Sequence, residues 1–227
     1  MSQIDTFRSV PFFASLSDQE LGILADSLRK RTFAKGMIIF HKDSPGRSLY
    51  IIASGKVRIF ILSESGQEIS VRIYGRGDVF GELSILDGLP RSAGAAALEK
   101  TEVLTLDRED FLALLERFPR IALDIIATLS KRIRYTTTYV ESLAFLDVFG
   151  RVAGRLLELA DCYGVDACEG RAIDLRLTQT ELASLVATTR ESVNKVLGTF
   201  RDEGLIKLDG QRIIILDRRG LQRKTVY

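Results

Sequence analysis

The most informative part of this sequence reads Phe80-Gly81-Glu82-Leu83-Ser84-Ile85-Leu86-Asp87-Gly88-Leu89-Pro90-Arg91-Ser92-Ala93. A helical turn after Gly81 would direct free backbone N–H groups towards an anion. Arg91 adds a forked, permanently charged donor that suits a phosphate, and Ser92 adds a hydroxyl. Glu82 would be repelled by a phosphate, but it can accept hydrogen bonds from the hydroxyls of a sugar. The stretch is typical of a site for a nucleotide with a single phosphate, although a buried Arg–Glu pair beside a short capped helix would use the same residues.

Composition and charge limit the class of protein. A chain of 227 residues has room for two ordinary domains, and 46% hydrophobic with 27% charged residues is typical of a globular protein with a sizeable core. The formal net charge of +2 gives no strong attraction to nucleic acid or membrane. No apolar run approaches the roughly 20 residues that span a bilayer, and no signal peptide precedes Phe7. We therefore expect a cytoplasmic protein without a membrane partner.

Few side chains are available for metal binding or acid–base catalysis. Cys162 and Cys168 are the two cysteines and His41 is the one histidine, which is too few for a four-ligand zinc or iron–sulfur site. His41 lies in a turn-like run, where we expect a solvated loop residue rather than a haem ligand. The two thiols are either unrelated or a redox pair. Glu82 has no partnered base or metal, so we expect no enzyme, no metal and no haem.

Residues 31–107 predict a β-rich domain. Short β-type runs are separated by glycine turns, a pattern typical of a barrel or sandwich, and residues 80–93 would lie inside it. Before this domain, Ser17 and Glu20 form a capping box that predicts a helix as far as Leu28. The expected strands are Met37–Phe40, Leu49–Ala53, Val57–Leu62, Glu68–Ile73, Val79–Phe80, Ala93–Ala97 and Val103–Leu106.

A long helix is predicted from about Ile121 to Phe145, after a shorter helix over Arg108–Arg117. Its apolar residues alternate steps of three and four, which predicts the seam of a two-stranded coiled coil. Tyr135, Tyr139 and Phe145 would extend the apolar surface. A helix packed only on its own domain is the alternative. The seam positions are Ile126, Leu129, Ile133, Thr136, Val140 and Leu143.

Thr136 is the polar exception in this seam, and Thr137 follows it. A hydroxyl in an aliphatic seam costs stability unless it is hydrogen-bonded. The two hydroxyls would either bond back to carbonyls of their own helix or contact the base of a nucleotide held against the dimer axis.

The last third of the chain predicts a winged helix-turn-helix. Asp147 can cap a helix to about Cys162, and residues 163–174 are expected to form a loop. Thr178 and Glu181 form a second capping box, a short turn follows, and a second helix begins at Arg190. Residues 205–207 and 213–215 then predict a β-hairpin wing.

The outer face of the second helix carries the residues expected to contact DNA. Arg190 can bind guanine bidentately, Glu191 can accept from the amino group of cytosine, and Lys195 lies one turn later. The hydroxyls of Thr178, Thr189 and Ser192 suit phosphate contacts. Basic and acidic residues nearly balance over residues 147–227, so no basic patch supports this reading. A small helical subdomain with a solvated charged face is the alternative.

Two groups of motifs resemble one family. Phe80-Gly81-Glu82-Leu83 followed by Pro90-Arg91-Ser92-Ala93 resembles the phosphate-binding cassette of cyclic-nucleotide-binding domains. Residues 188–193 with Lys195 resemble the recognition helix of the CRP/FNR family of bacterial transcription regulators. The resemblance covers nearly the whole chain, from residue 12 to the wing. It implies an α+β fold with a cyclic-nucleotide-binding β-roll over residues 1–118, a dimerisation helix and hinge over 119–146 and a winged helix-turn-helix over 147–227.

The resemblance also implies a function. In the cAMP receptor branch two adjacent hydroxyl residues of the long helix contact the adenine, and counting back from the hinge-like residues 143–148 places them at Thr136 and Thr137. Gly81, Glu82, Leu83, Arg91 and Ser92 would complete the ligand site. The expected effector is cAMP, with cGMP as the alternative. The expected partners are a second copy of the chain, a palindromic double-stranded DNA operator and RNA polymerase.

The sequence departs from the family pattern at several points. Ala187 occupies a turn position that is often glycine, and Lys195 stands where the cAMP receptor branch usually has arginine. The N-terminal cysteine cluster of the oxygen-sensing branch is absent. Three alternatives stay open: a family member with another effector or none, a cyclic-nucleotide module of an enzyme or channel, and a hydrolase that uses Glu82.

Overall fold

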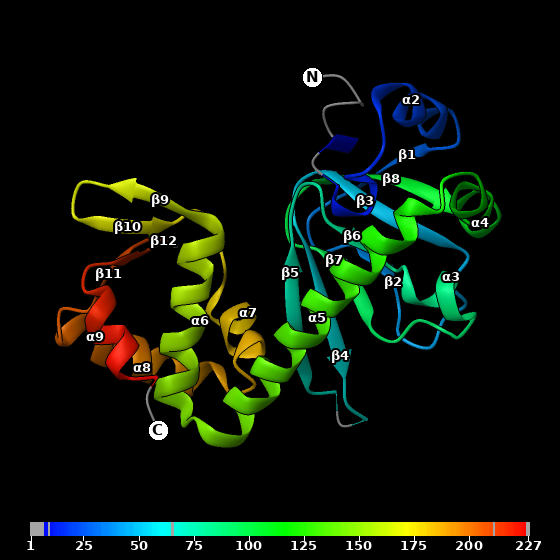
Figure 1. Cartoon of the computed structure of the whole chain (residues 1–227). Helices are drawn as coiled ribbons and strands as arrows, with labels where there is room; N and C mark the ends of the chain where they lie inside the picture. Colours follow the sequence, from blue (N-terminus) through cyan, green and yellow to red (C-terminus); the bar gives the residue numbers. More distant parts are fainter. Residues whose placement is uncertain (1–6, 9, 65, 211, 226–227) are drawn as a thin grey trace. The chain divides into compact units, whose positions relative to one another are not determined.

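The computed structural model describes residues 7, 8, 10–64, 66–210 and 212–225. The chain forms two compact units (Figure 1): an N-terminal unit of residues 1–67 and 71–134, and a C-terminal unit of residues 68–70 and 135–227. The division falls inside the long helix α5 (Arg120–Phe145).

Two four-stranded sheets form the centre of the N-terminal unit. Their strand orders are β1-β8-β3-β6 and β2-β7-β4-β5, and each described register is antiparallel. One buried cluster includes Phe12, Leu49 and Phe111, and a second includes Ile52 and Phe80. The strands are β1 (Arg29–Phe33), β2 (Ile38–Phe40), β3 (Ser48–Ser54), β4 (Val57–Leu62), β5 (Glu68–Tyr74), β6 (Val79–Phe80), β7 (Gly94–Ala97) and β8 (Thr101–Asp107). The helices are η1 (Pro11–Phe13), α2 (Asp18–Asp26), α3 (Leu83–Asp87) and α4 (Arg108–Arg117).

The predicted fold class is confirmed, and the seven predicted strands all form with small changes at their ends. In the N-terminal unit, the sequence did not predict strand β1. Four of its five residues are exposed and only Phe33 is buried, so no apolar alternation marks it. Pairing with β8 makes this segment a strand. The start of β1 at Arg29 also explains why α2 ends at Asp26, before the predicted Leu28.

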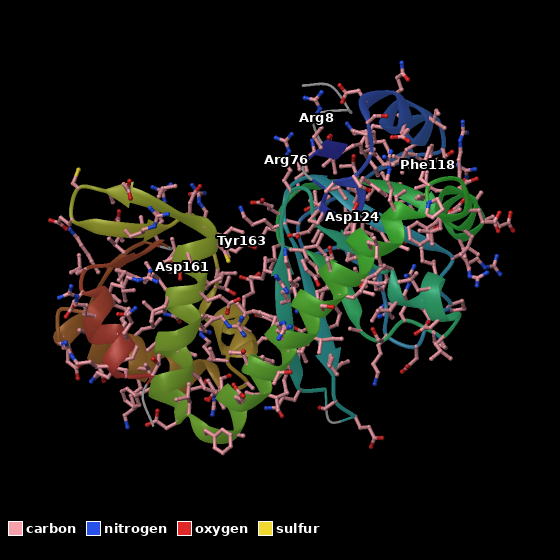
Figure 2. The ribbon with its side chains drawn as sticks, viewed as in Figure 1. Arg8, Arg76, Phe118, Asp124, Asp161 and Tyr163 are labelled. Carbon is pink, nitrogen blue, oxygen red and sulfur yellow. The ribbon has the colours of Figure 1, made fainter. Side chains whose placement is uncertain are left out.

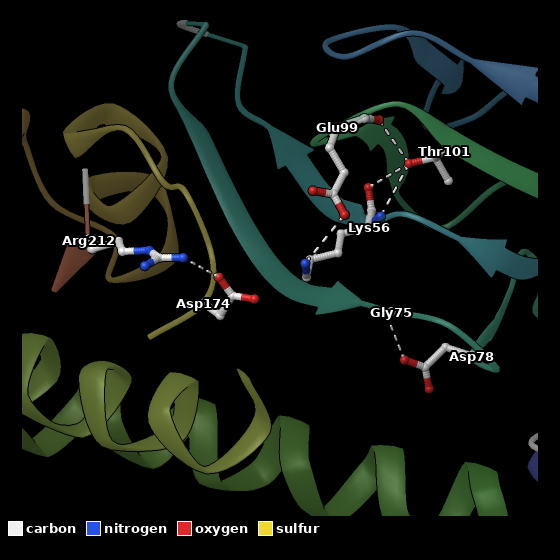
Figure 3. A network of polar contacts seen from close by, with 7 residues as sticks. All are labelled: Lys56, Gly75, Asp78, Glu99, Thr101, Asp174 and Arg212. Carbon is white, nitrogen blue, oxygen red and sulfur yellow. Dashed lines mark hydrogen bonds and ion pairs between the residues drawn. The ribbon is translucent and has the colours of Figure 1, made fainter. Parts of the chain in front are cut away.

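A buried hydroxyl fixes the turn between β3 and β4 (Figure 3). Thr101 Oγ1 accepts from the Lys56 backbone N–H at 3.2 Å and lies 3.1 Å from the Lys56 carbonyl oxygen and 2.9 Å from the Glu99 carbonyl oxygen, to one of which it can donate. Lys56 Nζ also pairs with Glu99 Oε1 at 3.3 Å. These contacts hold the turn against the first residue of β8.

The C-terminal unit contains a helix-turn-helix and a four-stranded sheet of order β11-β12-β10-β9. Helices α8 and α9 pack on α6, whose buried face includes Val152, Leu156 and Leu159. Asp161 of α6, labelled in Figure 2, accepts two hydrogen bonds of 2.7 and 2.9 Å from Arg218 of α9. The elements are α6 (Val148–Tyr163), β9 (Gly164–Ala167), β10 (Gly170–Ile173), α7 (Gln179–Leu185), α8 (Arg190–Asp202), β11 (Ile206–Asp209), β12 (Arg212–Ile215) and α9 (Arg218–Arg223).

The prediction of a loop over residues 163–174 is wrong. This segment forms the hairpin β9–β10, with Gly164 paired to Ile173 and Gly170 paired to Ala167. Its glycines and mixed charges suggest a loop, but β10 also pairs with β12, so the wing is part of a larger sheet. Helix α9 was not predicted either, although Asp217 caps it by accepting from the Gly220 N–H.

Candidate functional site

The chain turns sharply at Gly81, between β6 and α3. Gly81 has a positive φ of +75°, which disfavours residues with a side chain. A Cβ at this position would lie 2.6 Å from Arg91 Nη1. Glycine is therefore needed here both for the turn and for the close approach of the Arg91 side chain.

Arg91 is buried, with 3% of its surface exposed. Its Nη1 donates to the Gly81 carbonyl at 2.5 Å and to Ser84 Oγ at 3.3 Å, and its Nη2 donates to the Ser48 carbonyl at 2.7 Å. The guanidinium lies 4.3 Å from the centre of the Phe40 ring. Among the described residues no carboxylate lies within ion-pair distance of it, and its buried Nε has no hydrogen-bond partner.

This environment leaves the Arg91 charge without a counter-ion. Burial lowers the pKa of the Arg91 guanidinium because desolvation disfavours the charged form, and the charges of Tyr50 and Glu82 act in the opposite sense. A buried cation is costly unless an anion pairs with it. A phosphate accepting from Nε would satisfy both the charge and the orphan donor.

Glu82 is also buried, but it is not unpaired. Its Oε1 accepts from Arg132 Nη1 at 2.7 Å, and Arg132 Nη2 donates to the Val79 carbonyl. The Arg132 guanidinium lies 4.7 Å from the centre of the Tyr74 ring. Within the described part of the chain Glu82 Oε2 makes no hydrogen bond, so one carboxylate oxygen stays available to a sugar hydroxyl.

The sequence reasoning did not single out Arg132. Its position in the sequence could have indicated it. Arg132 precedes Thr136 by four residues and so lies on the same face of α5. The ion-pair partner of Arg132 is Glu82, which lies 50 residues earlier in the sequence.

The other predicted ligand residues are exposed. Leu83 is 41% exposed at the start of α3, and Ser92 is exposed directly after Arg91. Thr136 and Thr137 are exposed on α5, in the part of the helix that belongs to the C-terminal unit. The structure therefore brings Gly81, Glu82 and Arg91 together, and adds Arg132 to them.

The predicted seam of α5 leaves large apolar side chains in solvent. Ile126, Ile133 and Val140 are 59%, 67% and 56% exposed. Leu129 is partly buried against the core of the N-terminal unit. Such a stripe on a helix of 26 residues is what a coiled-coil partner would cover.

The role predicted for Tyr135 and Tyr139 is wrong. Their side chains turn away from the seam towards α6, where Tyr135 Oη accepts from Arg155 Nη1 at 2.6 Å. The Arg155 guanidinium lies 5.1 Å from the centre of the Tyr139 ring. Both tyrosines are half-buried in the C-terminal unit and add nothing to the exposed stripe.

The helix-turn-helix has the predicted geometry. Ala187 adopts a left-handed conformation with φ of 51°, the conformation for which glycine is favoured. Thr189 caps α8 by accepting from the Ser192 N–H. The buried stripe and the exposed face fall where the sequence places them: Val193, Val196, Leu197 and Phe200 are buried, and Arg190, Glu191, Asn194, Lys195 and Arg201 are exposed.

The candidate DNA-contacting groups have local partners. Thr178 Oγ1 accepts from the Glu181 N–H at 3.1 Å, so this hydroxyl caps α7. Arg190 Nε contacts Gln179 Oε1 only at 3.5 Å, which leaves the guanidinium accessible. Hydrogen bonds from its own backbone and from Thr189 lower the pKa of the Glu191 carboxyl, which keeps it ionised as an acceptor.

The described residues contain no group of three or more histidine, cysteine or acidic side chains that could hold a metal ion. His41 is exposed in a loop, and both cysteines are exposed and form no disulfide. Strand β9 separates Cys162 from Cys168 and spans about 10 Å, so in this arrangement the two thiols are too far apart to bridge. In the part of the chain that the structure covers, no helix is long and apolar enough to cross a membrane.

Comparison with known proteins finds a family match in each of the two units. Residues 30–118 match the family "Cyclic nucleotide-binding domain", and residues 150–224 match the family "Crp-like helix-turn-helix domain". The chain is 37% identical over 201 residues to the cyclic AMP receptor protein of Thermus thermophilus, covering 88% of this chain and 90% of that protein. It is 35% identical over 213 residues to the CRP-like cAMP-activated global transcriptional regulator of Mycobacterium tuberculosis, covering 94% and 95%.

Solved structures agree with these matches. The catabolite activator protein of Thermus thermophilus is 35% identical, with a TM-score of 0.55 over 95% of this chain and 98% of that one. The c-di-GMP responsive global regulator CLP of Xanthomonas campestris is 25% identical, with a TM-score of 0.79 over 88% and 99%. With a cyclic-nucleotide-binding domain, a long helix and a Crp-like helix-turn-helix domain, the chain belongs to the CRP/FNR family of bacterial transcription regulators.

Proposed function

We propose that this protein is a homodimeric, DNA-binding transcription regulator whose activity is controlled by a cyclic nucleotide, with cAMP as the effector. The observation that supports this most is the buried Arg91 guanidinium, which has an orphan Nε and no carboxylate partner among the described residues. A cyclic phosphate carries a single negative charge and would supply the missing acceptor. The free Oε2 of Glu82 would accept from the ribose hydroxyl.

The relatives support cAMP as the effector, since two of them are named for it. The second candidate is a regulator with another effector, because one structural neighbour is described as responding to c-di-GMP. Residues 1–118 would form the nucleotide domain, 119–146 the dimerisation helix and hinge, and 147–227 the DNA-binding domain. Thr136 and Thr137 would contact the base.

In the proposed dimer, two copies of α8 present Arg190, Glu191 and Lys195 to successive major grooves. Thr178, Thr189 and Ser192 would contact phosphates around them. Half-sites one helical turn apart, about 34 Å, would match the two-fold symmetry of the dimer and make the operator palindromic. Nucleotide binding would act by favouring the arrangement in which both helices fit. RNA polymerase would be the downstream partner, and the protein would act in the cytoplasm without catalysing a reaction.

The test is isothermal titration calorimetry of the full-length protein with cAMP, cGMP and c-di-GMP, for the wild type and for Arg91→Leu. We expect cAMP to bind the wild type at micromolar concentration or tighter, and Arg91→Leu to abolish that binding. Arg58→Leu is the matched control, because Arg58 also lies over an aromatic ring, 4.6 Å from the centre of Phe60, but outside the site. Thermal unfolding of each variant reports whether it stays folded.

Unchanged affinity of folded Arg91→Leu for cAMP would contradict the assignment of Arg91. Binding of cGMP or c-di-GMP instead of cAMP would change the effector and keep the mechanism. No binding of any of the three would favour a family member with a different effector or none.

A further inference from the structure

A cavity lies in the C-terminal unit, and none of its lining residues belongs to the cassette or to α8. It has a volume of about 470 Å³, within the range of about 300–1,000 Å³ typical of small-molecule sites. Its walls come from the last turns of α5, from α6 and from the end of α7.

Two hydrogen-bond donors on its walls are unpaired. The Tyr139 hydroxyl is buried and has no hydrogen-bond partner among the described residues, and the Arg155 guanidinium lies 5.1 Å from the centre of the Tyr139 ring. Arg151 donates through Nε to the Val186 carbonyl and through Nη1 to the Leu146 carbonyl, each at 2.9 Å. Within the described chain its Nη2 makes no hydrogen bond. A ligand that supplies an acceptor would complete both groups.

The charges around the cavity favour an anion. Arg155 is paired with Glu158 at 2.8 Å, so these two charges compensate each other. Arg151 has no carboxylate within ion-pair distance among the described residues, so no direct contact compensates its positive charge. Glu141 also lines the cavity, but it is exposed, so its charge is screened by solvent.

The remaining walls are largely apolar and include Leu146, Leu157 and Val186. We propose that this cavity binds a small organic acid. Its carboxylate would accept from Tyr139 Oη and Arg151 Nη2, and its apolar body would pack against the leucines. This chemistry differs from that proposed for the cassette, where a phosphate would accept from the buried Arg91 beside the Glu82 carboxylate.

A ligand bound in this cavity would affect the helix-turn-helix. Arg151 and Arg155 donate to the carbonyls of Val186 and Leu185, the two residues that precede the left-handed Ala187. A ligand held by Arg151 would therefore stiffen the end of α7. The binding proposal itself does not depend on the proposed function of the protein.

The test uses 3-phenylpropionate as the probe and 3-phenylpropionamide as its neutral match. Each is titrated into full-length protein and followed by saturation-transfer NMR and calorimetry. We expect the acid to bind at least tenfold more tightly than the amide, since only the acid brings a negative charge to the Arg151 guanidinium. Excess cAMP should leave the probe bound.

Two variants locate the probe. Tyr139→Phe removes only an unpaired hydroxyl, so it should keep the fold and weaken the acid about tenfold. Gly154→Leu should abolish binding by filling the cavity. Gly154 lines it, a Cβ there would meet Thr225 Cγ2 at an ordinary 3.6 Å, and leucine favours a helix interior more than glycine does. Tyr163→Phe, at the far end of α6, is the control and should bind like the wild type.

Three results would overturn the proposal. The first is equal binding of acid and amide. The second is binding that survives Gly154→Leu or that cAMP displaces. The third is no binding of 3-phenylpropionate at about 10 mM, because a carboxylate that accepts from both Tyr139 Oη and Arg151 Nη2 should bind in the millimolar range.

Discussion

Glu82 Oε1 and Arg132 Nη1 lie 2.7 Å apart and form a buried ion pair between the residue before α3 and the middle of α5. The side chains are 6% and 16% exposed, so water screens the pair little. The acid that would hold the ribose is thus already oriented by the long helix. A ligand that contacts Glu82 would therefore be coupled to α5 through this pair.

Removing Arg132 should destabilise the N-terminal unit. Arg132→Ala leaves the Glu82 carboxylate buried without its partner, and we expect the free energy of unfolding to fall by about 3 kcal/mol, measured by urea denaturation. Glu82→Gln combined with Arg132→Met should recover most of this loss. Lys30→Ala, which breaks an exposed pair with Glu102, should cost under about 1 kcal/mol. A similar cost for both single variants would argue against a structural role for the buried pair.

The Tyr135 hydroxyl should lose its proton at a higher pH than an ordinary tyrosine does. Burial is the main cause that raises the pKa of its hydroxyl to about 12, while Arg155 acts to lower it. Because the folded pKa lies above the ordinary value of about 10, the stability contribution is complete below pH 10 and is lost as the pH rises towards 12. Tyrosinate absorbance should show one fewer late-titrating group in Tyr135→Phe, and the stability of this variant should fall less over that range. Identical titration curves would contradict the burial of this hydroxyl.

A charge in the α5 stripe should break the dimer. Ile133→Glu places a carboxylate at a seam position, so sedimentation velocity should show a monomer at concentrations where the wild type is a dimer. Ala127→Glu is the matched control, since Ala127 is exposed on the same helix but off the seam. Dimers of Ile133→Glu as tight as those of the wild type would exclude this stripe as the interface.

Glycine should suit position 187 better than alanine. Since Ala187 has φ of 51°, Ala187→Gly should raise the free energy of unfolding by about 0.5–1 kcal/mol, and Ala187→Val should lower it by more. Thermal unfolding checks both. A loss of stability in Ala187→Gly would mean that the turn is not strained by a side chain.

We expect Glu191 to contribute more to base preference than to the total affinity for DNA. Glu191→Ala removes an exposed acceptor whose lowered pKa keeps it charged, and we expect base preference at one operator position to relax by about 1–3 kcal/mol. Fluorescence anisotropy with a set of single-base operator variants measures this. Thr199→Ala, on a hydroxyl bonded back to the Lys195 carbonyl, should leave the preference unchanged. An equal loss of affinity on every operator would count against base reading by Glu191.

Short-range signals in the sequence were sufficient for the helices and turns that carry the candidate sites. The capping boxes at Ser17 and Thr178 form as predicted, because each involves residues only three positions apart. Gly81 and Ala187 were singled out because a turn constrains its own backbone. The buried stripe of α8 follows from the 3.6-residue period alone.

Contacts between distant segments had to come from the tertiary structure. The Glu82–Arg132 pair spans 50 residues, and strand β1 and the hairpin β9–β10 exist because β8 and β12 pair with them. The sequence alone predicts that Tyr135 and Tyr139 add to the apolar surface of a coiled coil. In the structure both contact Arg155 of α6 instead. The physical reason is the same in each case: a residue's spacing determines which helix face or strand it occupies, whereas its partner depends on which other segment packs against that face.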